Sequence, residues 1–259
     1  MNCLVSLVRL GADAFRERPI LLSAQRLSAH GRRDPLLPAT SLHVRRGELL
    51  LVTGGRQDHR TALALLLSGR MKPSEGFISW DGSERLKARR LASALVDSPG
   101  VNEPEQHLSV RDLVTEDLAL IPRRYRGALV SGPWLKVNSF EDIADLWTEQ
   151  LDPDRRMELL TALALANPHT DLLVVDSPDR HTAEAAKWLP RLQRLASDAG
   201  RPLAVVATVG ALPPSWDGPA AAIGNAVPLE SPTREAPTRG DGGEQDAAKT
   251  TELETEVAT

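Results

Sequence analysis

The sequence predicts an α/β fold built on a parallel sheet. Three apolar runs, at residues 48–53, 171–176 and 202–208, are continuous, as in strands that are buried on both faces. A helical pattern begins at Thr61 after the first run, and another fills most of 182–200 between the other two. Because strands that alternate with helices form parallel sheets with crossover connections, these runs are expected to share one sheet.

Shorter β segments surround the first buried run. Residues 20–27 and 40–44 are predicted strands, and residues 76–82 form a β segment closed by an Asp-Gly turn. Residues 91–96 are a further strand candidate.

Helices dominate the middle of the chain. The helix that starts at Thr61 is expected to end at Ser68-Gly69, and Pro190 is expected to disturb the helix in 182–200. From about 99 to 168, three helical patterns follow one another without a buried strand, at 110–120, 140–147 and 155–166. This stretch is predicted to be a helical insertion into the α/β core.

Composition fits an ordinary folded domain with a tail. The chain has 259 residues, of which 41% are hydrophobic, and a net charge of −4, so no global basic field suggests nucleic acid. The single cysteine, Cys3, cannot form an internal disulfide, which fits a reducing cytosol. Abundant Arg, Ala and Leu are typical of a GC-rich bacterial genome.

Both ends of the chain differ from its centre. Residues 1–18 are predicted to be an N-terminal arm, in which Leu4, Leu7, Val8 and Phe15 could share one helical face. An extra arm or a misplaced start codon explains it, and so does a membrane-surface or partner-docking helix. No cleavage site of a signal peptide follows, and no apolar stretch approaches the ~20 residues that span a bilayer. Residues 228–259 are predicted to be a disordered acidic tail, which leaves one domain at 19–227.

A candidate phosphate-binding loop follows the first buried run. Gly54 and Arg60-Thr61 lie at the spacing of the pattern G-x-x-x-x-G-K-[ST]. In such a loop, backbone N–H groups and a helix N-terminus surround the phosphates, a lysine neutralises them, and a hydroxyl ligates Mg²⁺. Here His59 stands in place of the second glycine and Arg60 in place of the lysine. The loop alone is weak evidence, so its surroundings decide the interpretation.

Those surroundings resemble the nucleotide-binding domain of ABC transporters, from about Pro19 to Val227. The matching segments occur in the family's order, namely "SLHVRRGELLLVTG", "LLLSGRMKPSEGFISWDG", "LSVRDLV" and "ANPHTDLLVVDSP". The resemblance implies a P-loop NTPase-like ABC cassette. Such a cassette has a parallel core sheet, an N-terminal antiparallel β part and a helical subdomain, here at about 99–168.

The resemblance also shows where this chain departs from the family. Gln57 occupies a position of the loop that is a small glycine in the family. The Walker B aspartate is kept as Asp176, but Ser177 replaces the catalytic glutamate that follows it, and Val209 replaces the H-loop histidine. No residue is therefore predicted to be catalytic.

Three further family positions are altered. The Q-loop glutamine falls at about Ser98, the signature motif at residues 150–154, "QLDPD", and the adenine-stacking aromatic near His30. Loss of a general base alone costs roughly 10²–10⁴-fold in rate. Since phosphoryl transfer depends on positioning and charge stabilisation, the combined losses predict no fast hydrolysis.

The positions that match the family's motifs still mark a candidate site for ATP and Mg²⁺. Thr61 and Asp176 are the predicted Mg²⁺ ligands, and ATP with Mg²⁺ is expected to bind weakly or not at all. The predicted nucleotide-binding residues are Gly54, Gly55, Arg56, Gln57, Asp58, His59, Arg60, Thr61 and Ala62.

Each of these side chains also has an interpretation without a ligand. Thr61 could pack in the first helical turn, and Asp176 could accept from backbone N–H groups at a strand end. His59 could be a tolerated polar loop residue. Arg60, planar and longer than lysine, could pair with a carboxylate such as Asp176 and plug the site. The basic run 123–126 is ordinarily solvated surface, but it could also meet acidic lipid headgroups or a membrane partner's loop.

Three functions remain open from sequence. The first is a degenerate ABC-transporter-like ATP-binding subunit, a weak nucleotide binder or pseudo-ATPase that forms the structural or regulatory half of a membrane transport complex. Its partners would be a membrane-embedded permease-type protein and another cassette, as a homo- or heterodimer, without nucleic acid. It would lie in the cytoplasm, peripheral to the inner face of the cell membrane. The second is an active ATPase completed by its partner, and the third is a soluble scaffold without a role in transport.

Overall fold

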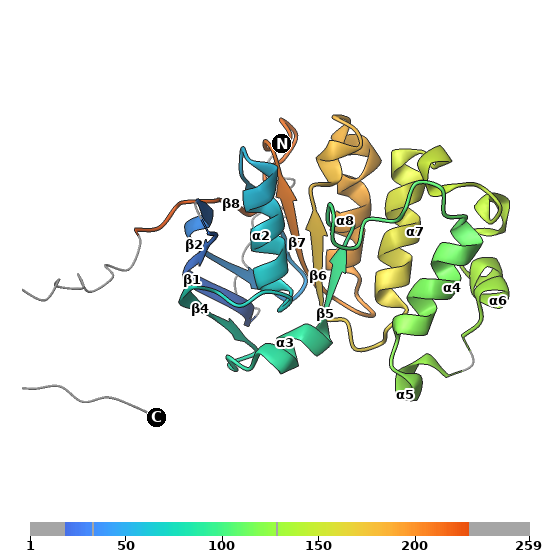
Figure 1. The fold of residues 1–259 in the computed structure, drawn as a ribbon, viewed down its shortest axis with the longest axis horizontal. Coiled ribbons are helices and arrows are strands. Elements are labelled where there is room, and N and C mark those ends of the chain that lie inside the picture. The colour runs from blue at the N-terminus through green and yellow to red at the C-terminus, as the bar shows by residue number, and fades with distance from the viewer. Residues whose placement is uncertain (1–18, 33, 128, 228–259) are drawn as a thin grey trace, which may run out of the picture. The chain divides into compact units, whose positions relative to one another are not determined.

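The structure, a computed structural model, describes residues 19–227 apart from 33 and 128 (Figure 1). The predicted N-terminal arm, 1–18, and the predicted acidic tail, 228–259, lie outside the described residues. None of the described helices combines the length and the apolar character needed to cross a membrane.

A five-stranded parallel sheet forms the centre of the molecule. Its spatial order is β5-β6-β7-β3-β8, and each neighbouring pair is parallel. The strands are β3 (Leu49–Thr53), β5 (Ser93–Val96), β6 (Leu172–Asp176), β7 (Ala204–Val209) and β8 (Ala220–Ala222). The three predicted buried runs thus lie in one sheet, while the short edge strand β8 was missed.

Both faces of the sheet are buried, which explains the continuous apolar runs. Along β3, Leu49 and Leu51 belong to one hydrophobic cluster, whereas Leu50 and Val52 belong to a second one on the other face. Side chains alternate between the faces of a strand, so a strand covered on both sides needs apolar residues at every position.

A separate antiparallel sheet covers one side of the core. Its order is β2-β1-β4, with β1 (Ile20–His30), β2 (Pro35–Arg45) and β4 (Glu75–Trp80). The second hydrophobic cluster lies between this sheet, the parallel sheet and helix α2 (Gln57–Leu67).

The connecting helices differ from the predicted ones at their starts. Helix α2 begins at Gln57 rather than at Thr61, although it ends, as predicted, before Ser68-Gly69. Helix α3 (Leu86–Ala92) takes up the first residues of the predicted strand 91–96. The predicted helix within 182–200 is a short 3-10 turn at Ala185–Lys187 followed by α8 (Leu189–Ser197), so Pro190 lies in a first helical turn, where proline is tolerated.

The middle of the chain is helical and packs beside the sheet, at the right of Figure 1. It contains α4, α5, α6, two 3-10 turns and α7, and its apolar side chains join the first hydrophobic cluster. The elements are α4 (Val110–Leu120), α5 (Arg123–Arg126), α6 (Ser131–Val137), the turns Glu141–Ile143 and Thr148–Gln150, and α7 (Pro153–Leu165). The predicted fold class is confirmed, with a parallel core sheet, an antiparallel part and helices.

Candidate functional site

The candidate phosphate loop is shorter than predicted. Between β3 and α2 only Gly54, Gly55 and Arg56 are outside regular structure. The N–H of Arg60 donates to the carbonyl of Arg56 at 3.2 Å, a helical bond, so the second half of the expected loop is the first turn of α2. Gln57 and His59 carry side chains where a wide loop uses glycines. Since non-glycine residues disfavour left-handed conformations, these residues favour the right-handed helix.

Gly54 is needed for close packing at the start of this loop. Its N–H donates to the carbonyl of Val209 at 3.0 Å. A Cβ atom here would lie 2.6 Å from Ile223 Cδ1 and 3.3 Å from Arg60 Cγ. The strand end, the residues after β8 and the Arg60 side chain therefore meet closely here, and a side chain at position 54 would require Ile223 to shift.

Arg60 fills the position that the lysine of a phosphate loop would take. Its side chain is buried, with 9% of the residue exposed. Nε donates to Ser177 Oγ at 2.9 Å, and Nη2 donates to Gln57 Oε1 at 2.6 Å. Nη1 donates to the carbonyls of Gly54 and Gly55, the latter at 3.2 Å. The guanidinium thus takes loop carbonyls and neighbouring side chains as its acceptors.

Gln57 connects this arginine to the Walker B strand. While its Oε1 accepts from Arg60, its Nε2 lies 2.9 Å from Ser177 Oγ, 3.1 Å from Thr61 Oγ1 and 3.2 Å from Asp176 Oδ1. A glycine at this position could make none of these contacts. The substitution at 57 and the substitution at 60 therefore stabilise the same arrangement.

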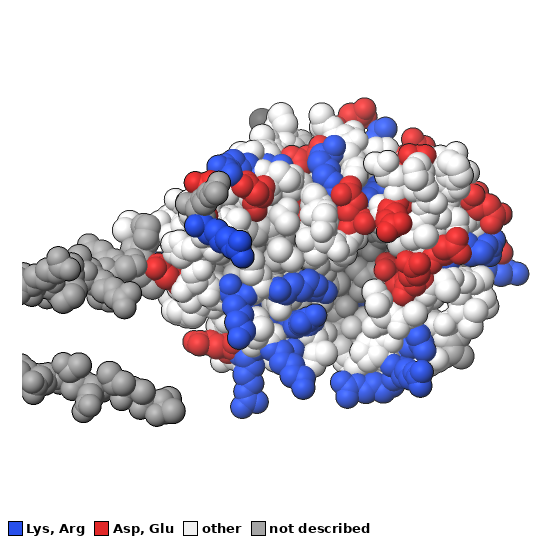
Figure 2. Space-filling model, in the orientation of Figure 1, with Lys and Arg blue, Asp and Glu red and all other residues white. Residues whose placement is uncertain are grey.

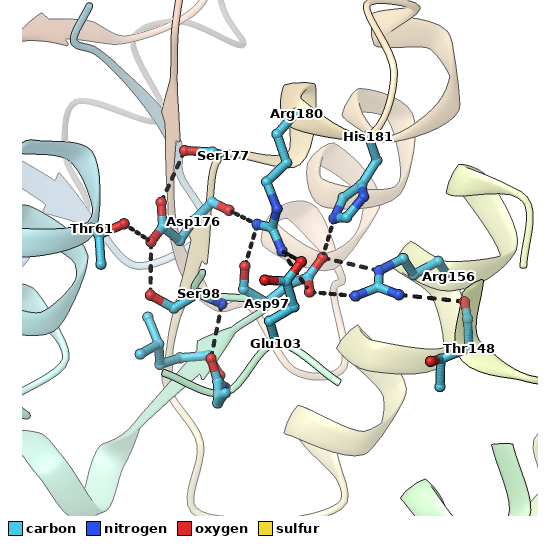
Figure 3. Close-up of polar contacts among 12 residues, drawn as sticks. Thr61, Asp97, Ser98, Glu103, Thr148, Arg156, Asp176, Ser177, Arg180 and His181 are labelled. Atoms are coloured by element: carbon cyan, nitrogen blue, oxygen red, sulfur yellow. Dashed lines mark hydrogen bonds and ion pairs between the residues drawn. The ribbon is translucent and has the colours of Figure 1, made fainter. Parts of the chain in front are cut away.

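Asp176 is completely buried at the end of β6 and accepts hydrogen bonds from five side chains. Both carboxylate oxygens are occupied, at distances from 2.7 to 3.2 Å (Figure 3). The donors are Gln57, Thr61, Ser98, Ser177 and Thr208. Buried charge is costly unless it is hydrogen-bonded, and here hydroxyl and amide groups supply that stabilisation.

Thr61 and Asp176, the predicted Mg²⁺ ligands, are brought together by the fold. Thr61 Oγ1 donates to Asp176 Oδ2 at 2.8 Å, and Ser98 Oγ donates to the same oxygen at 2.7 Å. Asp176 is fully buried, and both of its oxygens accept hydrogen bonds from side chains. The hydroxyl and the carboxylate are oxygen ligands of the kind that Mg²⁺ prefers, and in this conformation they are bonded to each other.

The other predicted loop residues lie away from this centre. Arg56 and Asp58 form an exposed ion pair, and Asp58 Oδ1 also accepts from the N–H of His59 at 3.0 Å. This charge pair lowers the pKa of Asp58 to about 2, chiefly through the hydrogen bond from Arg56. Ala62 is buried in the second hydrophobic cluster. The N–H of His59, a candidate phosphate donor, is thus already used.

Ser177 and Val209 stand where the resemblance predicts a catalytic glutamate and the H-loop histidine. Ser177 is buried with φ at +55°, and its N–H donates to the carbonyl of Thr208 at 3.0 Å. Its hydroxyl lies between Arg60, Gln57 and Asp176 and has no free side toward a substrate. Val209 is buried in the first hydrophobic cluster. Neither side chain can polarise a water molecule.

A second buried network, which the sequence did not predict, lies next to the first (Figure 3). Asp97, directly after β5, accepts two bonds from Arg156 of α7, at 2.8 and 3.2 Å. Arg180 Nη2 lies 2.9 Å from Asp97 Oδ1 and 3.1 Å from Glu103, and His181 Nε2 lies 2.8 Å from Asp97 Oδ2. Burial would raise the pKa of Asp97, but the bonds from His181 and Arg156 and the charges of both arginines hold it below its usual range.

Arg180 joins the two networks. Its Nη1 donates to the carbonyl of Asp176 at 2.8 Å and to the carbonyl of Asp97. Asp97, Glu103 and His181 also offer ligand atoms within 4.8 Å of one another. Two guanidinium groups already neutralise Asp97 there, so this cluster is an ion-pair network rather than a metal site.

The remaining predicted positions do not reach the loop. His30 contacts Ser74 through its backbone and Glu75 through its ring, on the antiparallel sheet. Residues 150–154 end a 3-10 turn and begin α7 at Pro153, with Asp152 as an N-cap without a side-chain bond.

Comparison with known proteins rests on structure alone. No protein-family model and no curated protein sequence matches the chain. A nucleotide-free ATP-binding cassette from an ABC transporter matches with a TM-score of 0.57 and 13% identity, over 74% of this chain and 81% of that chain. The dimeric structure of MJ0796, a bacterial ABC transporter cassette, matches with a TM-score of 0.56 and 19% identity, over 74% and 88%.

The chain has the fold of an ATP-binding cassette. A third cassette, cbiO1 from Clostridium perfringens, part of the ABC transporter complex cbiONQ, is similar with a TM-score of 0.50 and 21% identity, over 73% and 78%. The cassette fold explains the order of the elements, including the helical segment between β5 and β6. The loop before α2 joins β3 of the parallel sheet to the helix that follows it, where the sequence resemblance predicts the phosphate loop.

Proposed function

We propose that this chain is a non-hydrolysing ABC-type cassette subunit whose nucleotide position is closed by its own Arg60. It serves as the structural or regulatory half of a membrane transport complex. The observation that carries the proposal is the placement of the Arg60 guanidinium against the carbonyls of Gly54 and Gly55.

The closed loop supports the loss of phosphate binding. A phosphate needs N–H donors directed at it, whereas here two loop carbonyls face inward toward a cation. Opening the site would break four bonds of a buried arginine and expose the carbonyls to phosphate oxygens. The sequence leaves open whether ATP binds weakly or not at all, and we propose that it does not bind.

The lost catalytic groups support the loss of hydrolysis independently. Ser177 stands in place of the expected glutamate. Its hydroxyl is hydrogen-bonded to Gln57, Arg60 and Asp176 within the protein. Even with nucleotide present, neither Ser177 nor Val209, which stand at the expected catalytic positions, can act as a general base.

The proposed partners come from structurally similar cassettes. MJ0796 has a dimeric structure, and cbiO1 is part of a transporter complex. We carry both properties over as proposals: a second cassette that supplies catalysis, and a permease-type membrane protein. The location at the inner face of the membrane is part of the same proposal.

Steady-state phosphate release tests the proposal. The full-length chain with Mg-ATP is expected to give the same background rate as its Asp176→Ala variant, because neither site holds the reacting groups. Turnover at about 1 s⁻¹ or faster, within the usual enzyme range, that disappears in Asp176→Ala would refute the pseudo-ATPase. An active complex formed only with a second cassette would instead favour the composite ATPase.

A further inference from the structure

A group of unpaired cations covers one face of the molecule, away from the closed loop. In Figure 2 these blue side chains lie along the lower edge, over α3 and α5, at the amino end of the parallel strands. We call this surface the basic face. It comprises Arg70, Lys72, Arg85, Lys87, Arg90, Arg123, Arg124 and Arg126.

The cations of this face have no acidic partners. None of its eight residues forms an ion pair with another described residue, and the segments 70–72, 85–90 and 123–126 contain no acid, although the exposed Glu84 directly precedes Arg85. What sets the basic face apart is the number of unpaired cations that it gathers.

The cations are also held close together. Desolvation, and after it the charge of Arg90, lower the pKa of Arg70. Beneath α3, Arg89 is buried with 2% exposed, and it donates only to the carbonyl of Ile78, at 3.3 Å, while its Nε has no partner. Like charges repel at such positions, so an anion bound there would relieve the repulsion.

Helix α5 is fixed although it is short. The Tyr125 ring lies 4.0 Å from the His169 ring, and the Arg124 guanidinium lies 4.5 Å from the Tyr125 ring. Arg126 donates to the carbonyl of Ala119 at 3.2 Å. Three basic residues are thus presented together from a defined backbone.

Apolar side chains are exposed among these cations. Leu120, the last residue of α4, is 80% exposed, and Leu91, directly after Arg90, is 45% exposed. Cations beside exposed leucines suit the headgroup boundary of an anionic bilayer, where charge and apolar insertion act together. Nucleic acid fits less well, because base stacking needs a free aromatic face, and Tyr125, the aromatic of this surface, is covered by Arg124 and His169.

We propose that the basic face binds directly to an anionic lipid surface. The contact is independent of the closed loop, and it goes beyond the proposed docking to a permease, since it needs no membrane protein.

Vesicle flotation with the full-length chain tests this inference. Binding is expected to vesicles of phosphatidylcholine containing phosphatidylglycerol, and not to phosphatidylcholine alone, and it should weaken as salt rises. Reversal of four exposed charges, in the variant K87E/R90E/R123E/R124E, should lower the bound fraction at least about tenfold.

A matched control distinguishes the effect of the basic face from the effect of net charge. The variant R32E/R194E reverses two exposed cations on the β1–β2 connection and on α8, and it is compared with R123E/R124E, which has the same net charge. The α5 pair should lose most of the binding and the control pair little. Equal losses, or no binding to anionic vesicles, would overturn the proposal, as would binding of RNA by a chain that ignores vesicles. A chain that floats only with co-reconstituted membrane protein would also overturn it.

Discussion

At the scale of single residues, two substitutions change what the phosphate-loop position can hold. Gln57 and Arg60 stand where the family has glycine and lysine, and in the structure they bond to each other at 2.6 Å. Lysine has three donors on a point charge, whereas the planar guanidinium has five N–H donors, and Arg60 makes four hydrogen bonds from its three nitrogens. The arginine thus acts as an internal ligand of the loop.

Removal of this internal ligand should destabilise the fold. Arg60→Ala removes four hydrogen bonds, one of them to the buried hydroxyl of Ser177, together with the packing of a buried side chain. We expect a loss of about 2–4 kcal/mol in the free energy of unfolding, measured by urea denaturation.

Arg56→Ala is the matched control for this prediction. Arg56 is an exposed arginine of the same loop, paired with Asp58, and its loss should change stability by less than about 0.5 kcal/mol. Equal stability of Arg60→Ala and the wild type would contradict the internal-ligand role.

At the scale of elements, buried charge holds the helical segment to the sheet. Asp97 after β5 and Arg156 of α7 form a bidentate pair, and Arg180 and His181 close the network from the turn after β6. Removal of one partner of such a pair strongly destabilises the fold, because the remaining charge stays buried without its counter-charge.

Acid should weaken this network. The pKa of Asp97 is depressed in the folded chain, so its contribution is complete above the unfolded value of about 4 and is lost as pH falls below it. Asp97→Asn is expected to cost about 3–5 kcal/mol at pH 7, and the difference from wild type should shrink below about pH 4. As a control, Asp145→Asn removes an exposed ion pair with Arg111, and it should lower the free energy of unfolding by less than about 0.5 kcal/mol. A constant difference across this pH range would refute the assigned ionisation.

Asp117 of α4 predicts the opposite pH dependence. Burial and then the charge of Glu116 raise the pKa of Asp117 to about 6. The folded state therefore binds its proton more tightly, and stability falls as pH rises from about 4 to 6. Asp117→Asn should be more stable than wild type by about 1–2 kcal/mol at pH 8 and equal to it near pH 4. Thermal unfolding at both pH values measures this difference in stability. Asp217→Asn, at an exposed position, is the control and should match the wild type at both pH values.

Much of the fold could be predicted from the sequence, and the site only in part. The strands β3, β6 and β7 were found because burial on both faces leaves an unbroken apolar run. The start of α2 was placed four residues late, because the loop pattern outweighed the helical preference of Gln57 and His59. The network around Asp97 could not be predicted, because Arg156 and Arg180 are distant in sequence and charged residues usually signal surface.

At the scale of the whole molecule, the chain has the fold of an ATP-binding cassette, and Arg60 fills the loop before α2 from within. The core sheet, the antiparallel part and the helical segment are all present, so the changes at the loop do not reflect a failure of the fold. We infer that closure of this loop by Arg60 prevents nucleotide binding.

Thermal unfolding with and without Mg-ATP tests that claim most directly. A nucleotide at 100 times its Kd stabilises a protein by about 2.7 kcal/mol, which is roughly 5–10 °C in Tm for a domain of this size. If Arg60 closes the loop, the Tm of the wild type should change by less than about 1 °C at millimolar Mg-ATP. A saturable rise of several degrees in the wild type, absent with Mg²⁺ and AMP, would contradict it.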